Sequence, residues 1–316
     1  MRTALQYQNL PTPVEEKWKY TNLPRAMPPG LSAVTPEEKI IHVSRGQSPD
    51  EAFEINFTGQ TNRLHTPVLK ITLEDNAQAT LIERHDGQGA YWKNMVTDIT
   101  LGANARLHHV RIQDDDTAAI QTNMVTVRLA RDSNYDGFSL NVGGKLTRHD
   151  LHARIEGVNA ECTFNGLNLL NGQQHADTTI LIEHLAPHCR SNQFYRTLLD
   201  DASRGVFQGK VHVHKPAQKT DAYQLSNAIL LSDKAEMDTK PELEIYADDV
   251  KCSHGSTTGQ IDEAPLFYLR SRGLSEKEAR LLLIQAFVDE VMDKIADENQ
   301  RASIQTRVYA WLHAAL

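Results

Sequence analysis

Apolar and polar residues alternate along most of the middle of the chain, in short segments that each lead into a polar turn. Such a segment opens with apolar residues at alternate positions and continues into Gly, Asn, Asp or Pro. Alternation with a period of two is typical of a strand that buries one face. The segments begin at Ile71, Ile99, Val127, Ala153 and Ile180, and the next start is expected near Val206.

The spacing of these segments predicts a solenoid of stacked coils. Successive starts are 28, 28, 26 and 27 residues apart, and the step to Val206 is 26. A repeat of this length made of strands and turns fits coils that stack at about 4.8 Å. Between the segments there is no helical period and no leucine-rich-repeat spacing. We therefore expect a mainly β fold with a parallel β-helix core, and an antiparallel β-sandwich is the alternative.

The two ends of the chain follow other patterns. Residues 1–37 are rich in proline, which predicts extended chain with at most one short helix. Residues 38–259 hold the expected β-helix core. Residues 260–316 are expected to form a helical subdomain that covers the end of the solenoid or offers a face to a partner. It opens with a capping box of Ser275 and Glu278. Its apolar stripes are Ala279, Leu282, Leu283, Ala286, Phe287, Val291 and Ile295, then Ile304, Val308, Trp311 and Leu312 in a second helix over residues 300–314.

Charge and cysteine content narrow the possible partners and the compartment. The formal net charge of −8 argues against nucleic acid as the main partner. No apolar run approaches the length of a membrane span, and the first ten residues lack the apolar core of a secretory signal. Cys162, Cys189 and Cys252 cannot all pair within one chain. We therefore expect a cytoplasmic protein that binds neither membrane nor nucleic acid.

Several cysteines and histidines are candidate ligands. Cys162 and Cys189 are 27 residues apart, so they are expected to stack in adjacent coils, as core residues or as the start of a soft-metal site. His212 and His214 share the outer face of a strand, without an evident third ligand. No histidine pair has a zinc-site spacing, so solvated or structural roles are favoured.

A second Cys–His pair follows the expected last strand, residues 243–247. Cys252 and His254 are two residues apart, so alternation projects both to one face. A thiolate and an imidazole are a suitable ligand pair for iron, and a pair that merely caps the solenoid is the alternative. Two ligands leave a cluster incomplete, so a metal here would need a second chain. No phosphate-binding loop or nucleophile elbow is present, and no catalytic residue is assigned.

The sequence Asp-Asp-Val-Lys-Cys-Ser-His-Gly at residues 248–255 resembles a signature of SufD-type members of the SufB/SufD family of iron–sulfur cluster assembly scaffold proteins. The resemblance is dense over residues 204–288. SufB-type members are less similar, because their corresponding region is rich in glutamate. Further matching segments are residues 16–23, 207–211, 218–224, 241–247 and 266–274.

This resemblance implies a right-handed parallel β-helix with helical regions at both ends, here with a shortened N-terminal region. It also implies a non-catalytic subunit that acts with SufB and the ATPase SufC. A nascent cluster would form near the SufB contact, with His254 as the candidate ligand and Cys252 beside it, and no cofactor would be bound stably. The residues implied in SufC docking are Phe267, Tyr268, Leu269, Arg270, Arg272, Gly273, Leu283 and Phe287.

The last coil of a β-helix leaves backbone groups unpaired, and another strand can extend it. We expect SufB to pair with the coil that carries Leu243, Ile245, Ala247 and Val250. In the absence of SufB, the same edge could pair two copies of this chain. The alternative function is a β-helical polysaccharide-active enzyme, but paired carboxylates do not recur at the repeat offset.

Overall fold

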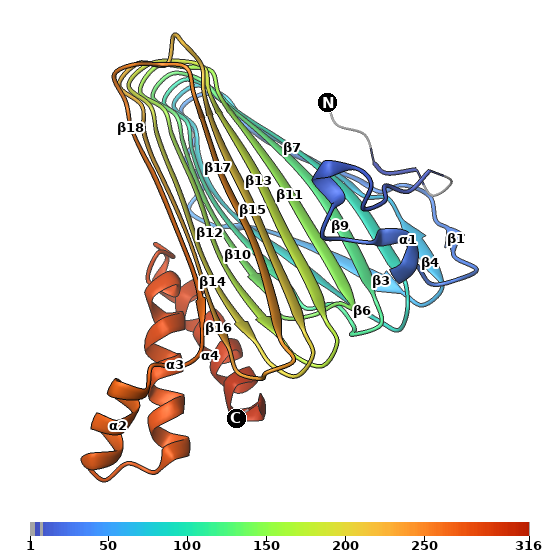
Figure 1. Ribbon diagram of the computed structural model, residues 1–316. Coiled ribbons are helices and arrows are strands. Elements are labelled where there is room, and N and C mark those ends of the chain that lie inside the picture. Colours follow the sequence, from blue (N-terminus) through green and yellow to red (C-terminus); the bar gives the residue numbers. More distant parts are fainter. Residues whose placement is uncertain (1–3, 7–8, 316) are drawn as a thin grey trace.

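The protein is a parallel β-helix with helices at its C-terminal end (Figure 1), described by a computed structural model over residues 4–6 and 9–315. The expectation about a secretory signal in residues 1–10 lies partly outside these residues. The strands form two sheets, and neighbouring strands within each sheet are parallel. Along most of the chain, successive strands belong alternately to the two sheets, so each full coil contributes a strand to both. The parallel β-helix predicted from the repeat is confirmed.

The first sheet, called sheet 1, has ten strands within the described residues. These are β1 Ser32–Ala33, β2 Glu38–Val43, β4 Arg63–His65, β5 Val68–Leu73, β7 Trp92–Leu101, β9 Ile120–Leu129, β11 Leu146–Ile155, β13 His175–His184, β15 Arg204–Val213 and β17 Glu236–Ile245. Sheet 2 has eight: β3 Phe53–Gln60, β6 Gln78–Gln88, β8 Arg106–Gln113, β10 Asn134–Asn141, β12 Glu161–Leu170, β14 Arg190–Leu199, β16 Asp221–Leu230 and β18 Lys251–Gly259.

The register of sheet 1 corrects the predicted repeat at its later coils. Ile71, Ile99, Val127 and Ala153 lie opposite one another on successive strands, as predicted. Ala153 then pairs with Ile182, not Ile180, and Ile182 pairs with Val211, so the start near Val206 was wrong. The coil lengthens because β12 has ten residues where β10 has eight. The same shift pairs Cys162 with Ser191.

The predicted stacking of Cys162 on Cys189 is therefore wrong. Cys189 precedes β14, and the backbone N–H of the next residue, Arg190, donates to the carbonyl of Ala160. Both cysteines are free and buried in the apolar core between the sheets. Burial raises the pKa of both thiols, which keeps them protonated at neutral pH.

One corner of the coils is built from a column of turn residues with positive φ. Asn76, Asn104, Asp132 and Asn159 have φ between 57° and 61°, and their successors His188 and Lys219 have similar values. Asn and Asp adopt this left-handed conformation more readily than other non-glycine residues. Asn104 also donates to the side chain of Asn76, and Asn159 to that of Asp132. The corner is thus held by side chains that repeat once per coil.

The N-terminal segment packs on the outer face of sheet 1. It contains a 3-10 turn, η1 Glu16–Trp18, and one short helix, α1 Leu23–Ala26. Trp18 and Leu23 pack with Trp92 and other residues of the sheet. The guanidinium of Arg148 lies 4.1 Å from the centre of the Trp18 ring. The segment therefore covers the side of the β-helix as far as β17, where Glu16 pairs with Lys240, and within the described residues it does not pair with the free edge of that strand.

The C-terminal helices are α2 Glu263–Ser271, α3 Glu276–Met292 and α4 Glu298–Ala315. The capping box at Ser275 and Glu278 is confirmed. Helices α3 and α4 pack on the outer face of sheet 2, not on the end of the solenoid (Figure 1), because that face carries outward-pointing apolar residues such as Leu167, Leu169 and Leu198, which the helices bury. The last coil is left open as a result.

The predicted stripe of α3 is partly wrong, because Leu282 and Ala286 are exposed while Ile284 and Val288 are buried. The α4 stripe is confirmed at Ile304, Val308 and Leu312, and Trp311 is half-buried. No helix over the described residues is long and apolar enough to cross a membrane. The division into three domains stays a prediction.

Candidate functional site

The C-terminal end of the β-helix presents two edge strands. β17 ends sheet 1 and β18 ends sheet 2, and each pairs on one side only within the part of the chain that the structure describes. An edge strand leaves a row of backbone N–H and C=O groups that another strand can satisfy. Cys252 and His254 lie within β18, so the motif forms the last strand itself and does not merely follow it.

Cys252 and His254 share one face of β18, as their spacing predicted. Cys252 pairs with Ala222 and is half-buried beside Val211, Val213 and Ala247 in the interior of the solenoid. His254 pairs with Gln224, which is fully buried, so its strand position also faces the lumen. Burial raises the pKa of the Cys252 thiol, so a ligand role would require the metal to displace its proton. Since β18 is the final strand, His254 is exposed at the open end.

A row of buried amides lies beneath His254. Gln193 and Gln224 are opposite one another on β14 and β16, directly below His254 in register. Both are fully buried, and neither side-chain amide has a hydrogen-bond partner among the described residues. An unpaired buried polar group costs about 1 to 3 kcal/mol. The lumen below His254 therefore carries polar groups that can bind a ligand or a water molecule.

Gly209 on the opposite sheet makes room for these amides. A Cβ atom at Gly209 would lie 1.7 Å from Nε2 of Gln224 and 2.9 Å from Oε1 of Gln193. Both side chains therefore cross the lumen and rest on the backbone of β15. Only glycine leaves this space, which gives Gly209 a direct role in placing the amides under His254.

The open end offers an incomplete set of metal ligands. Within the described residues, no third His, Cys, Asp or Glu lies close enough to form a three-ligand group with Cys252 and His254. Iron–sulfur clusters and soft metals require more ligands than a thiolate and an imidazole. This arrangement can hold a metal or cluster only together with ligands from elsewhere. The role of both residues as ligands stays a prediction.

The residues expected to contact SufB lie at this same end. Leu243 and Ile245 are in β17, and Ala247 and Val250 are in the turn that leads to β18. Ile245 is exposed, while the other three pack beside Cys252 in the interior. Three of the four side chains are thus turned away from a partner, and the backbone edge of β17 would make most of such a contact. That contact stays a prediction.

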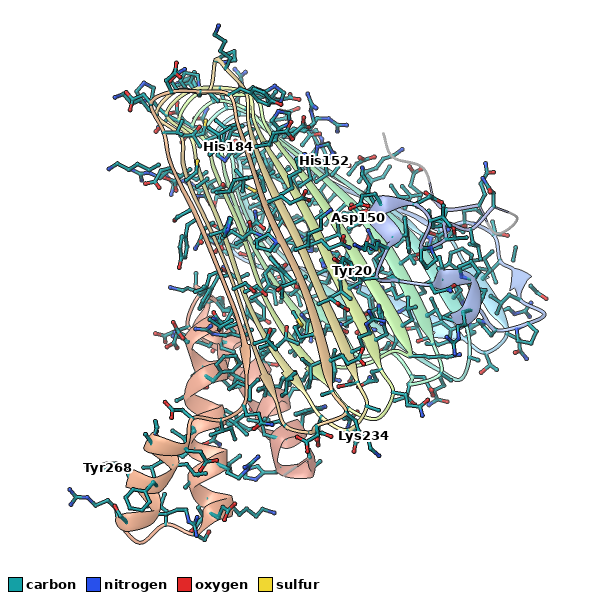
Figure 2. All side chains as sticks on the ribbon, viewed as in Figure 1. Tyr20, Asp150, His152, His184, Lys234 and Tyr268 are labelled. Atoms are coloured by element: carbon teal, nitrogen blue, oxygen red, sulfur yellow. The ribbon has the colours of Figure 1, made fainter. Side chains whose placement is uncertain are left out.

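The residues expected to dock SufC divide into two groups. The first lies on and just after α2, which projects away from the β-helix and packs against α3 (Figure 2). Phe267 is 75% exposed and Tyr268 56% exposed, Arg270, Arg272 and Gly273 are exposed, and Leu269 is half-buried. Exposed aromatic and arginine side chains are typical of protein interfaces.

The second group, Leu283 and Phe287, lies on α3 and is half-buried against sheet 2. The Arg196 guanidinium of β14 stacks 4.7 Å from the Phe287 ring and pairs with Glu290. These two residues therefore hold α3 on the β-helix. The docking of SufC stays a prediction for both groups.

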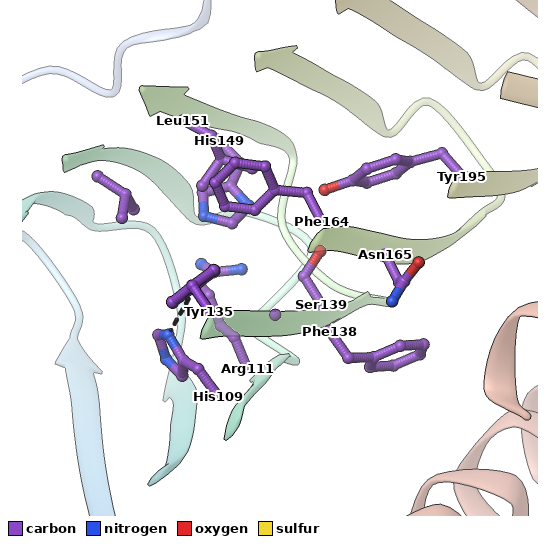
Figure 3. A pocket seen from close by; sticks show the side chains of 12 residues that line it. His109, Arg111, Tyr135, Phe138, Ser139, His149, Leu151, Phe164, Asn165 and Tyr195 are labelled. Atoms are coloured by element: carbon purple, nitrogen blue, oxygen red, sulfur yellow. Dashed lines mark hydrogen bonds between the residues drawn. The ribbon is translucent and has the colours of Figure 1, made fainter. Parts of the chain in front are cut away.

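The described residues also enclose a small cavity deeper in the lumen (Figure 3), lined by Arg111, Tyr135, His149 and neighbouring side chains. His109 Nδ1 lies 3.0 Å from the Tyr135 hydroxyl at its wall. The cavity volume is about 20 Å³, which is room for about one water molecule. It is too small for an organic substrate, so the open end is the better candidate site.

Sequence reasoning missed two features. Gln193 and Gln224 gave no signal, because an unpaired buried amide is visible only once the coils are stacked. Glu183 was not recognised as a neighbour of His212, although the two lie opposite one another on β13 and β15. Their spacing of 29 residues equals the true coil length at this point and could have revealed the pair.

The chain matches the family described as "SUF system FeS cluster assembly, SufBD core domain" over residues 56–287. It is 37% identical over 274 residues to an iron–sulfur cluster assembly SufBD family protein of Synechocystis, covering 83% of this chain and 59% of the relative. It is 32% identical over 271 residues to the iron–sulfur cluster assembly protein SufD of Escherichia coli, covering 85% and 62%.

A third similar protein is the chloroplastic protein ABCI7 of Arabidopsis thaliana, 30% identical over 287 residues, with 86% of this chain and 60% of the relative covered. The chain thus spans about three fifths of the length of these relatives. The similarity to SufD supports the assignment to the SufD type. Because one relative is chloroplastic, the cytoplasmic location stays a prediction.

Proposed function

This chain belongs to the SufBD family of iron–sulfur cluster assembly proteins, and from that premise we propose that it is a SufD-type scaffold subunit without catalytic activity of its own. In this proposal it acts in the cytoplasm with SufB and the ATPase SufC. Iron and sulfide are its cargo, and a nascent cluster is held only transiently, where this chain meets SufB.

The Cys252–His254 pair at the open end is the observation that carries the proposal. A thiol and an imidazole share one face of the last strand, above buried amides that have no hydrogen-bond partner among the described residues. The described residues supply no third ligand beside them. A half-complete ligand set at an unpaired strand edge suits a site that is finished by a second chain.

Strand addition at β17 and β18 is the proposed mode of SufB binding. Each edge has a free row of backbone donors and acceptors within the residues described, and backbone pairing can join two solenoids end to end. Ile245 is exposed on β17, while Leu243, Ala247 and Val250 support the turn from inside. Such pairing would bring the partner's ligands to His254.

The projecting helix α2 is the proposed SufC contact. Phe267 and Tyr268 expose large aromatic rings, and the guanidinium of Arg272 lies 5.2 Å from the centre of the Tyr268 ring. Helix α3 connects α2 to sheet 2 through Arg196, Phe287 and Glu290. A motion of SufC at α2 would therefore be transmitted to the wall of the β-helix next to the cluster site.

Co-expression with SufB and SufC tests both contacts. We expect Phe267→Asp to abolish recovery of SufC and to leave SufB bound, because it buries a charge in the proposed contact. Val158→Asp is the matched control, since Val158 is also an exposed apolar residue but lies in a turn of the β-helix. Unchanged recovery of SufC with the α2 variant would contradict the docking assignment.

His254→Ala tests the cluster site in the same complex. We expect the variant to fold and to assemble with SufB and SufC, but to mature far less cluster in cells, because an exposed ligand is lost without disturbing the core. His108→Ala, at another partly exposed histidine, is the control. Normal cluster maturation with His254→Ala would contradict the proposal, as would ATP hydrolysis by the isolated chain.

A further inference from the structure

A second cluster of ligand side chains lies on the outer wall of the β-helix. His212 on β15 and His214 just after its end project outward, and Glu183 projects outward from β13 directly beside His212. One ligand atom from each of these three residues lies within 4.8 Å of the others. All three are half-buried, so an ion could reach them while their side chains stay restricted.

The spacing of two of these atoms matches that of a pair of metal ligands. Nε2 of His214 and Oε1 of Glu183 are 3.4 Å apart, yet Nε2 is buried and makes no hydrogen bond within the described residues. Two ligands, each about 2.1 Å from a tetrahedral metal, stand about 3.4 Å apart. The rings of His212 and His214 are stacked with centroids 4.0 Å apart, so small rotations can direct both toward one point.

The other oxygen of Glu183 is fixed by its neighbours. Oε2 lies 2.6 Å from Nε2 of His152 and 2.9 Å from Nη1 of Arg154, both on β11. These contacts orient the carboxylate and leave Oε1 directed to the histidines. Ligating carboxylates in proteins are commonly held in this way by hydrogen bonds to the second oxygen.

Two imidazoles and one carboxylate define the class of ion. Calcium and magnesium prefer all-oxygen sites, and copper(I) prefers sulfur. Two histidines with one carboxylate, leaving further positions for water, suit iron(II), cobalt(II) and zinc(II). We propose that Glu183, His212 and His214 bind one such divalent transition-metal ion on the outer face of sheet 1.

This outer site is separate from the open end, and strand β15 lies between the two. Along β15, His212 alternates with Val211 and Val213, and those valines pack inside the solenoid beside Cys252. The proposed ion and the Cys252 thiol would therefore lie on opposite sides of the same strand. Because its ligands all come from this chain, the outer site should bind metal without SufB, whereas the Cys252–His254 site should not.

Cobalt(II) titration of the isolated full chain tests the proposal. We expect one Co²⁺ per chain, with the visible absorption of a low-coordinate nitrogen and oxygen site. His212→Ala/His214→Ala should weaken binding by at least about tenfold, and Glu183→Gln should do so with minimal change in shape. His108→Ala is the matched control, because His108 also faces a carboxylate, Asp136 at 3.1 Å, without a third ligand. Far-UV circular dichroism checks that each variant folds.

Two results would overturn the proposal. One is cobalt binding that is equal in the wild type and in Glu183→Gln, or no binding at micromolar concentrations. The other is loss of the cobalt spectrum in Cys252→Ala/His254→Ala, which would assign the ion to the open end. A spectrum retained in that double variant and lost in Glu183→Gln supports the outer site, whether or not the cluster-assembly role is correct.

Discussion

Near the start of the β-helix, the carboxylate of Glu83 lies between His85 and His109, and His109 Nε2 is 2.9 Å from Glu83 Oε2. Burial opposes ionisation of this carboxyl, but the two histidines outweigh it and hold the pKa of Glu83 well below its usual range. Near the last coils, Gln193 and Gln224 occupy the lumen with no protein partner for their amides within the described chain.

The two regions share the same wall geometry, since Glu83 and Gln224 both lie on sheet 2 and both face the lumen fully buried. The two regions differ in whether their buried polar side chains have partners. Around Glu83, contacts with His85 and His109 and an ion pair with Arg111 hold the first coils together, because removal of the carboxylate leaves its partners unpaired. Unpaired buried amides do not stabilise the fold, and Gln193 and Gln224 are therefore available to a ligand or a water molecule below His254.

The largest expected effect on stability comes from removing the carboxylate of Glu83 from its contacts. Glu83→Leu should lower the free energy of unfolding by about 3 to 5 kcal/mol, because it leaves His85, His109 and Arg111 buried without their carboxylate. Urea unfolding of the purified chain measures this. A loss below about 1 kcal/mol would mean that these contacts do not stabilise the first coils.

The second-largest effect is a pH dependence of stability, which follows from the burial of histidine. Burial lowers the pKa of His184 to about 4, so the unfolded state binds a proton below about pH 6.5 while the native state does not. Stability should therefore fall as pH drops from 6.5 toward 4. His184→Gln should reduce the loss between pH 7 and pH 5 by about 2 kcal/mol. Equal pH dependence of the two proteins in urea unfolding would contradict this.

At the open end, Gly209→Ala should cost about 1 to 3 kcal/mol, because the added methyl group meets the buried side-chain end of Gln224, which must shift. It should nevertheless lower cluster maturation in cells by displacing the amides below His254. Gly259→Ala on β18 is the matched control, since nothing lies within 4 Å of its added Cβ. Equal cluster maturation in the two variants would show that Gly209 has no role in the site.

The smallest effect on folding is expected at Gln224. Gln224→Leu should change the free energy of unfolding by less than about 1 kcal/mol, or raise it, because the amide it removes has no partner. The same replacement at Glu83 provides the contrast. If Gln224→Leu lowered the free energy of unfolding by several kcal/mol, the polar side chains at both ends of the lumen would stabilise the fold, which would contradict the comparison.

Much of the fold could be predicted from the sequence, because successive coils repeat the same alternation of apolar and polar residues and lead into polar turns. The register of later coils could not, since a strand two residues longer moves Cys162 opposite Ser191 without any change in pattern. The α3 stripe failed for a related reason. Nearly every position from Ala279 to Val288 is apolar, so packing against sheet 2 selected Ile284 and Val288 over Leu282.

The candidate site was predictable only where its residues are close in sequence. Cys252 and His254 are two residues apart, and alternation alone indicated their shared face. Gln224, Gly209 and Glu183 join their neighbours through pairing between coils. Such contacts depend on register, and register depends on strand lengths that local patterns do not determine.

Iron and acid-labile sulfide analysis tests the central claim that the open end is half of a shared site. The measurement compares the isolated chain with the same chain purified in complex with SufB and SufC after anaerobic reconstitution. We expect no iron–sulfur cluster on the isolated chain, and a cluster on the complex that is lost with His254→Ala. A stable cluster on the isolated chain, or an unchanged iron and sulfide content in the His254→Ala complex, would contradict the shared site.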